Sequence, residues 1–526
     1  MMGATAKRRD NRIKKAERRL QGSLTVFLAL SIPVILSLIF VLLDGARRNA
    51  IRMQTELAAD AAVNAALAEF SRELFLQYDL LMIDTSYGTG TPSVSNTERH
   101  IRHYMEENLS QKNPEWFEKA DLLTTSLSGL EMTDTRLATD DDGRALREQV
   151  QAYLSAEPFG ELASGILSAA NGYHGFGFDL TEWDRRKSEN EEELQRGLEE
   201  ARNRRKQKQE MRADGTLEET QEDQEEEEKA AGARAVATES GVDEEHAGNP
   251  WKEVNEMRRT PILTAVLEGK EISHESVEPD RYLSHRSFQK GNGQEAENSH
   301  HYREADALFM NAYINEKCGN YQKPLEKSRL KYQMEYLLYG KGADQENLEK
   351  AAQTLLLIRL AANTAYLFSD GAKKGEAKLW GGILSLICFC PELEEAFTTA
   401  LLLAWSYSES MQDLRTLFSG GKVPLMKNSG TWKTGLLSIF SPGLAGGGAG
   451  EGSGLDYTEY LRVLLFLENR NMRDFRLMDL MEMDVRKAEK TESFRMDGCL
   501  DTFFIEAKVT GKAGYECSIQ REGSYG

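Results

Sequence analysis

Residues Gln21–Arg48 read QGSLTVFLALSIPVILSLIFVLLDGARR, and the 21 residues from Ser23 to Leu43 carry no charge. An α-helix rises about 1.5 Å per residue, so this run spans roughly 31 Å, the thickness of a bilayer's hydrocarbon core. We therefore expect a transmembrane helix over 23–43. Pro33 lies at mid-span, where membrane helices tolerate the lost hydrogen bond and the resulting kink.

A cleaved export signal is the alternative interpretation of this stretch. Such a signal has an apolar region of about 7–15 residues, followed by a small-x-small cleavage site. A cut after Ala46 would place Asp44 at the −3 position, and a cut after Gly45 would place Leu43 there. Neither residue is small, so we expect the helix to remain as an anchor.

Basic residues flank the apolar run unequally. Only Arg47, Arg48 and Arg52 follow it closely, whereas eight basic residues precede it. This excess predicts a single-pass protein of the cell membrane, with the N-terminus in the cytoplasm and the bulk outside. A nucleic-acid-binding arm is the alternative reading of the basic segment. The eight residues are Lys7, Arg8, Arg9, Arg12, Lys14, Lys15, Arg18 and Arg19.

Composition limits the exterior part. The chain has 526 residues and a net charge of −20, which argues against nucleic acid as a partner. Five cysteines are too few for a disulfide scaffold. Cys388 and Cys390 lie in an apolar run and are expected to be buried. Cys499 and Cys517 flank a predicted hairpin and form a candidate disulfide, if the strand register permits.

The anchor helix is expected to continue outward through 49–78, because no Gly or Pro interrupts this segment. Apolar residues at helical spacing predict an amphipathic helix that packs on a neighbour. That neighbour is either the protein's own ectodomain or a sister subunit. The predicted stripe consists of Met53, Leu57, Leu67, Phe70 and Leu74.

The next region mixes short strands and helices. We expect a strand over 79–85, a helix with a capping box of Ser95 and Glu98, a strand over 121–135, and a helix over 140–172. His100, His103 and Glu107 share one helix face. Zinc could use such a set, but no fourth ligand is nearby and a solvated face is the preferred interpretation. Residues 184–245 are so rich in charge that we expect them to bury no core.

A second globular part begins near Trp251 and is predicted to be helical, with a strong helix over 347–368. The apolar runs 379–390 and 396–407 are too short to cross a bilayer and predict a buried helical pair; a membrane-associated hairpin is the alternative. Thr416 and Val423 break the phosphate-loop pattern around SGGKVPLMK (419–427). Two helices and a terminal β-hairpin around 511–514 are predicted to follow.

The predicted fold class is α+β and mostly helical. The expected organisation is a basic cytoplasmic arm, a transmembrane helix, an extracellular helix with an α/β region, a charged disordered or helical insertion, a helical domain, a Gly-rich linker, and terminal helices with a hairpin. The corresponding ranges are 1–22, 23–43, 44–180, 181–250, 251–440, 441–454 and 455–526.

The opening stretch resembles the N-termini of TadE/TadG-type pseudopilins of the tight-adherence pilus system. Gly22-Ser23 matches the start of their pattern, Pro33 has the same spacing from the glycine, and Asp44 lies near the acidic-glycine end. The resemblance implies a possible processing site at Gly22 and Ser23, and a pilin-like anchor marked by Pro33 and Asp44. It also implies a glutamate five residues after the glycine, where this chain has Phe27. That departure predicts an anchor that stays uncleaved in the membrane.

A second set of motifs covers the rest of the chain. It includes AEFSRELFLQYDLLMID, MEYLLYGK, ENLEKAAQTLLLIR, LLLAWSYSESMQDLRTLFSGGKVPLMK, DYTEYLRVLLFL and RLMDLMEMDVR. With these motifs the chain resembles the DUF5702 proteins of Firmicutes over almost its full length. The resemblance implies a pilus or secretion locus and supplies no catalytic residues.

The sequence contains no nucleophile–base pair, metal triad or paired-carboxylate motif, so we expect no enzyme activity, no cofactor and no metal. The favoured function is an anchored structural or accessory protein of a Tad or type IV-like surface apparatus. Expected partners are the membrane, pilus or secretion-system subunits, or a second copy through the N-terminal helix. A tethered binding or sensor ectodomain is the alternative, and an ecto-enzyme is the least favoured.

Overall fold

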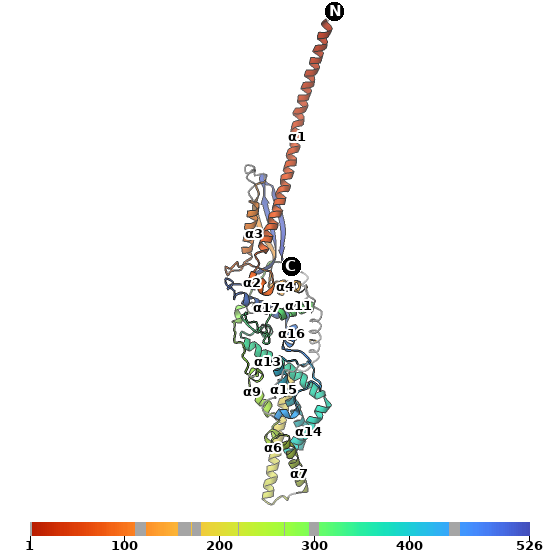
Figure 1. The fold of residues 1–526 in the computed structure, drawn as a ribbon, viewed down its shortest axis with the longest axis vertical. Helices are drawn as coiled ribbons and strands as arrows, with labels where there is room; N and C mark the ends of the chain where they lie inside the picture. Colours follow the sequence, from red (N-terminus) through yellow and green to blue (C-terminus); the bar gives the residue numbers. More distant parts are fainter. Residues whose placement is uncertain are drawn as a thin grey trace.

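The fold is α+β and mostly helical. The computed structural model describes residues 3–110, 123–155, 170, 180–218, 220–267, 269–293, 304–440 and 453–525. The molecule is elongated (Figure 1): α1 (Gly3–Leu67) extends from one end, and α6 (Leu180–Ala213) with α7 (Gln221–Glu239) forms the other.

A small antiparallel sheet lies beside the second half of α1. Its central strand is β3 (Cys499–Thr510), which pairs with β2 (Ser126–Leu137), β4 (Glu516–Ser524) and the short β1 (Ile83–Asp84). Helices α1 and α3 (Val94–Leu109) pack together against this sheet and share an apolar core with it. The predicted terminal hairpin is thus confirmed, and it is completed by a strand from the N-terminal part of the chain.

The helical body contains the second, larger core. Helix α15 (Glu394–Phe418) is buried on almost every side and packs against α13 (Asp344–Ser369) and α14 (Gly371–Ile387). Asp370 separates α13 from α14, because its side chain accepts hydrogen bonds from the first backbone N–H groups of α14. The predicted buried helical pair and the helix over 347–368 are therefore confirmed.

The other helices of the body complete this core, and α2 and α4 join it from the N-terminal part of the chain. The two predicted helices before the hairpin are present, the first with a capping box of Asp456 and Glu459. The bounds of these helices are α2 Arg72–Tyr78, α4 Arg144–Leu154, α8 Glu244–Gly248, α9 Lys252–Arg259, α10 Ile262–Leu267, α11 Glu304–Lys317, α12 Gln333–Tyr339, α16 Tyr457–Leu467 and α17 Arg470–Val485.

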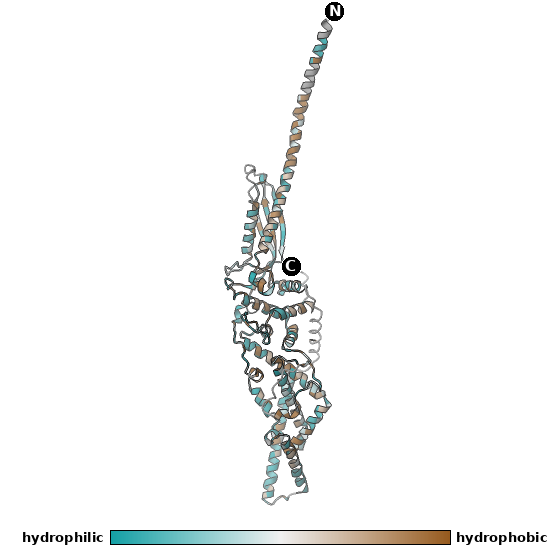
Figure 2. Ribbon diagram, viewed as in Figure 1, coloured by the Kyte–Doolittle hydropathy of each residue, from teal (hydrophilic) through white to brown (hydrophobic). Residues whose placement is uncertain are grey.

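The charged segment behaves differently from its prediction. Helices α6 and α7 form a hairpin whose polar tip projects from the body (Figure 2). Ion pairs join the two helices, including Arg205–Glu227 at 3.0 Å. The expectation that the segment buries no core is wrong, because its sparse apolar residues point inward at helical spacing. Those in the main core are Trp183, Leu194, Ala201, Ala233 and Ala237.

The helix predicted to continue from the apolar span also differs from its prediction. It ends at Leu67 instead of continuing to Tyr78, because Phe70 bridges to Ile83 and the Ser71 N–H donates to the Met82 carbonyl. A separate helix, α2, then begins. Backbone pairing with the sheet unit therefore wins over the helical propensity of the intervening residues.

Three smaller predictions need correction. The strand over 79–85 is reduced to β1, since Asp79 adopts a left-handed conformation with φ 53°. The helix expected to start at a Ser95–Glu98 capping box starts at Val94 after Ser93, with no side-chain cap. Of the helix over 140–172, only α4 and Ala170 fall in described helix, and most of the remainder lies outside the described residues. The Gly-rich linker likewise lies almost entirely outside them.

The cysteines carry no cross-link between Cys499 and Cys517, so that candidate disulfide is wrong. Cys499 stands opposite Asp84 and Cys517 opposite Val509, which places them at different ends of the sheet. All five thiols are free, and Cys390 is buried as predicted whereas Cys388 is half-buried.

Candidate membrane anchor and assembly surface

The apolar half of α1 lies outside both cores. No residue of 24–43 is buried, and the Phe27 side chain is 66% exposed. Figure 2 shows this hydrophobic stretch as a free helix between the polar N-terminal segment and the sheet. Pro33 lies inside the helix without ending it. Among the described residues, α1 is the one helix long and apolar enough to cross a bilayer.

The other predicted site residues lie on the same helix. Gly22 and Ser23 are helical, and their side chains lie outside the described part of the chain. Asp44 ends the apolar stretch and forms an ion pair with Arg48 at 2.9 Å, one turn further along. The two residues carry opposite charges at the point where the helix leaves its hydrophobic segment.

The junction between α1 and the sheet begins one turn later. The Arg48 guanidinium lies 5.6 Å from the centre of the Tyr515 ring, in the turn between β3 and β4. Ile51 is the first fully buried residue of the helix and packs against Gly511. A Cβ atom at Gly511 would lie 2.5 Å from Ile51 Cδ1, so the glycine permits this close approach.

The face of α1 toward the sheet is built from small residues. They let the helix approach the strands closely, as small residues do wherever helices pack tightly. At the far end, the Tyr525 hydroxyl donates to the Leu67 carbonyl at 2.5 Å, and Arg521 pairs with Asp60. The buried residues of this face are Ile51, Thr55, Ala58, Ala59, Ala62, Val63 and Ala66.

The predicted apolar stripe is therefore only partly correct. Leu74 is buried in α2, but Met53 and Leu57 are 62% and 58% exposed. The buried stripe is formed by the alanines that lie between the predicted positions, together with Ile51, Thr55 and Val63. Met53 and Leu57 lie on the outer side of the same helix as the exposed segment, four residues apart, and so share one face.

The histidine set is not a metal site. His100 Nδ1 lies 3.1 Å from the Glu69 carboxylate, and the His100 ring stacks on Tyr87 with centroids 3.9 Å apart. Glu69 also accepts a hydrogen bond from the Tyr104 hydroxyl. No group of metal-ligating side chains occurs among the described residues. His100 instead ties α3 to the end of α1, whereas His103 and Glu107 are exposed, as the preferred interpretation of a solvated face expects for them.

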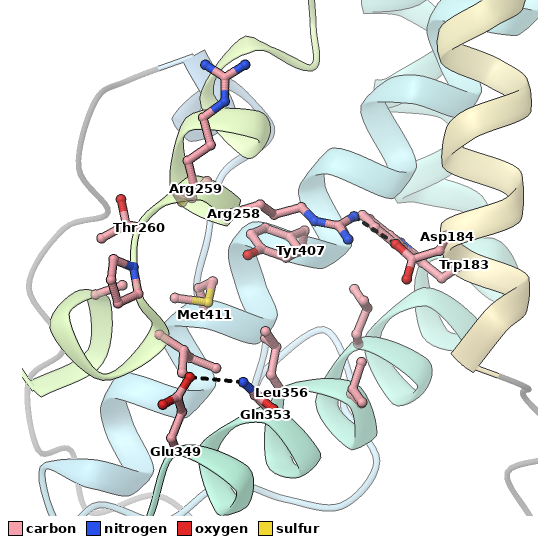
Figure 3. Close-up of a pocket in the computed structure, with 16 residues that line it drawn as sticks. Trp183, Asp184, Arg258, Arg259, Thr260, Glu349, Gln353, Leu356, Tyr407 and Met411 are labelled. Atoms are coloured by element: carbon pink, nitrogen blue, oxygen red, sulfur yellow. Dashed lines mark hydrogen bonds and ion pairs between the residues drawn. The ribbon is translucent and has the colours of Figure 1, made fainter. Parts of the chain in front are cut away.

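A surface cavity of about 510 Å³ lies in the helical body (Figure 3). Arg258 pairs with Asp184 at 2.8 Å and lies 5.4 Å from the Trp183 ring centre. Burial raises the pKa of Tyr407 to about 12, so this phenol stays protonated. The lining combines apolar side chains with an already paired arginine, which suits binding better than chemistry. Met257, Ile262, Leu356 and Met411 provide much of the apolar wall.

Sequence inspection missed a buried ionic cluster in the same body. Arg359 and Asp413 pair at 3.0 Å, and Lys427 contacts Asp413 at 2.6 Å and also Glu409. All four side chains are almost completely buried. The sequence signal that could have revealed this cluster is a charged residue inside each of two apolar helices, Arg359 in α13 and Asp413 in α15. The cluster holds α13, α15 and the following loop together and is closed to solvent, so we assign it to the fold.

A protein-family model provides the comparison with known proteins. A family of unknown function, DUF5702, matches residues 240–511, just over half of the chain. The chain belongs to the DUF5702 family. No curated protein and no solved structure matches it.

The DUF5702 match covers only part of the fold. It is shorter than the nearly full-length resemblance expected from the motifs. It includes helices α8 to α17 of the body and β3, but α1, α2, α4, α6, α7, β2 and β4 lie outside it. The matched region therefore contains the central strand of a sheet whose longer partner strands come from elsewhere in the chain.

Proposed function

We propose that this DUF5702 protein is a single-pass, membrane-anchored extracellular structural or accessory subunit of a Tad or type IV-like surface apparatus. The observation that carries the proposal is the form of α1. Its residues 24–43 are apolar and exposed, and the helix continues without interruption into a part that packs on a sheet. Such a helix can hold an ectodomain at a fixed height and angle above a bilayer.

The exposed Met53 and Leu57 support an assembly role. Large apolar side chains that stay exposed beyond the apolar span favour contact with another protein surface. They stand beyond the apolar span and on a helix whose opposite face is already filled by the sheet. A sister or partner subunit is the occupant that we propose for this face. The uncleaved N-terminus, with Phe27 at the position of the pilin glutamate, belongs to the same proposal.

Two experiments test it. Protease added to intact spheroplasts should digest the chain beyond residue 50, and survival of the terminal hairpin would contradict the orientation. Mass spectrometry should find the N-terminus intact, whereas a new terminus at Ser23 would mean that a prepilin peptidase accepts Phe27.

The assembly face is tested by site-specific cross-linking in cells. A photo-reactive residue at Met53 or Leu57 should yield adducts with a second copy or with subunits of a surface apparatus. Thr216, exposed on the connection between α6 and α7, provides the matched control position. If the α1 positions give no more adduct than Thr216, the assembly role is wrong.

A tethered binding ectodomain is the second candidate, and the cavity beside Trp183 and Arg258 favours it. Its apolar wall and guanidinium suit a small ligand with an apolar body and an acidic group. A thermal-shift screen of aromatic carboxylates tests this function. A stabilisation that disappears in Arg258→Ala would support it, and the absence of any stabilising compound would count against it.

A further inference from the structure

The turn between β3 and β4 is the part of the sheet nearest the apolar segment of α1. At one end of the hairpin, Arg48 lies over Tyr515 and Ile51 packs on Gly511. At the other end, Tyr525 reaches Leu67. The hairpin therefore runs parallel to α1, and its turn points back toward residues 24–43 (Figure 1).

The height of this turn above the apolar segment follows from helix geometry. Arg48 lies five residues after Leu43, which is about 7–8 Å at the helical rise of about 1.5 Å per residue. The headgroup layer of one leaflet is about 5–8 Å thick, from the difference between the whole bilayer and its hydrocarbon core. The side chains of the turn thus reach the level of the headgroups when 23–43 spans the bilayer.

The charge at this level is opposite to that of the whole protein. Three basic residues, Arg47, Arg48 and Lys512, stand against two acidic ones, Asp44 and Glu516, in a chain of net charge −20. Asp44 is paired with Arg48, and Lys512 is exposed on the turn. Tyr515 lies beside them, and tyrosine is enriched at membrane–water interfaces. Arg52 lies one helical turn further from the apolar segment and pairs with Glu56 at 3.0 Å.

We propose that this collar, formed by Arg47, Arg48, Lys512 and Tyr515, binds the headgroups of anionic phospholipids. The contact gives the ectodomain a second attachment beside the transmembrane helix and fixes its tilt on the membrane. The proposal rests on the membrane anchorage proposed above. Attraction of basic side chains to anionic lipid operates within about a Debye length, so only this end of the acidic ectodomain is drawn to the surface.

The test uses the full chain reconstituted in vesicles of phosphatidylcholine, alone or with phosphatidylglycerol. A fluorophore is attached at Glu516→Cys, next to the turn, or at Thr216→Cys, at the distant end of the molecule. Quenching by a lipid with a nitroxide on its headgroup reports contact, and the unsubstituted protein provides the labelling background. We expect strong quenching at position 516, none at 216, and a several-fold loss at 516 when Lys512→Glu is added in phosphatidylglycerol vesicles. Lys206→Glu, an exposed charge reversal on α6, should change nothing.

Each other result overturns a defined part of the proposal. Protein that floats with the vesicles but shows equal quenching at 516 and 216 excludes the headgroup contact. Quenching at 516 that changes neither with phosphatidylglycerol nor with Lys512→Glu excludes recognition of anionic lipid. Protein that does not float with vesicles overturns the anchor itself, and this contact with it.

Discussion

Arg359 Nε donates to Asp413 Oδ2 at 3.0 Å, and neither side chain has any exposed surface. The pair joins α13 to α15 at the centre of the helical body, where Asn363 also donates to Asp413. A buried charge is tolerated only when its partner remains, because desolvation of an unpaired ion costs several kcal/mol. The stability of the body therefore depends on this pair being complete.

Removal of one partner should be strongly destabilising. We expect Asp413→Ala to lower the free energy of unfolding by about 3–5 kcal/mol, because Arg359 and Lys427 would remain buried without their shared carboxylate. Urea unfolding followed by circular dichroism measures the change. The control is Asp184→Ala, which breaks the exposed Arg258 pair and should cost only about 0–1 kcal/mol. Equal effects of the two substitutions would show that the buried cluster contributes no more to stability than the exposed pair.

His246 predicts a pH dependence of stability. Burial opposes its protonation, and so does nearby Lys252, but hydrogen bonds with Glu253 and Asp243 raise its pKa above 6.5. Its ring nitrogens lie 3.1 Å and 2.7 Å from these two carboxylates. A raised folded-state pKa adds stability below the unfolded pKa, and this stability is lost as the pH rises through the folded value.

The difference in thermal midpoint between the wild type and His246→Gln should therefore be largest below about pH 6.5 and shrink as the pH rises. His103→Gln, on the exposed face of α3, is the matched control and should show no such trend. A difference that grows toward alkaline pH would contradict the doubly paired imidazolium.

The contact between Ile51 and Gly511 predicts a local weakening of the sheet unit. Gly511 has φ −106°, so alanine is free of backbone strain there, but its Cβ would meet the Ile51 side chain at 2.5 Å. We expect Gly511→Ala to destabilise this packing by about 1–3 kcal/mol, the usual cost of overpacking. Hydrogen exchange should become faster in 51–67 and in β3.

Gly232→Ala is the control for that substitution. Its new Cβ would meet no atom within 4 Å, and alanine favours the helix in which it lies. Protection in the sheet unit should be unchanged in this variant. Unchanged protection in Gly511→Ala as well would show that the Ile51 side chain moves aside without loss of stability.

The five thiols predict a specific alkylation pattern. Burial raises the pKa of Cys318 and of Cys499, which keeps both as unreactive thiols. Cys388 is the only half-buried cysteine, so a maleimide should modify it first in the native protein and reach the others on unfolding. Peptide mass spectrometry checks the site, with Cys388→Ser as the control. A linked Cys499–Cys517 peptide would contradict the strand register.

Periodicity predicted the long helices well, because a helix depends on contacts three and four residues apart. It failed for the part of α1 that packs on the sheet. There Met53 and Leu57 of the predicted stripe are exposed, and alanines form most of the buried face. Hydrophobicity measures what a residue gains from burial. It does not say which face has room for a strand, and a closely packed sheet selects small side chains.

The charged residues of the body were equally hard to place. Arg359 and Asp413 lie in different helices, 54 positions apart, and each by itself looks like an exception in an apolar run. Only the packing of α13 on α15 makes them partners. The cavity beside Trp183 likewise depends on the start of α6 packing beside α9 and α15.

Local composition was sufficient for the long apolar segment, the helical character of the body and the terminal hairpin, since charge-free length, helical spacing and alternation are properties of neighbouring residues. The pairing of β3 with β2 could not be predicted from local composition. Ser126 pairs with Thr510 across 384 positions of the sequence, and no local pattern encodes a pairing at that distance. The tertiary fold alone sets the hairpin along α1 with its turn toward the apolar segment, because backbone hydrogen bonds and packing surfaces from both ends of the chain must meet there.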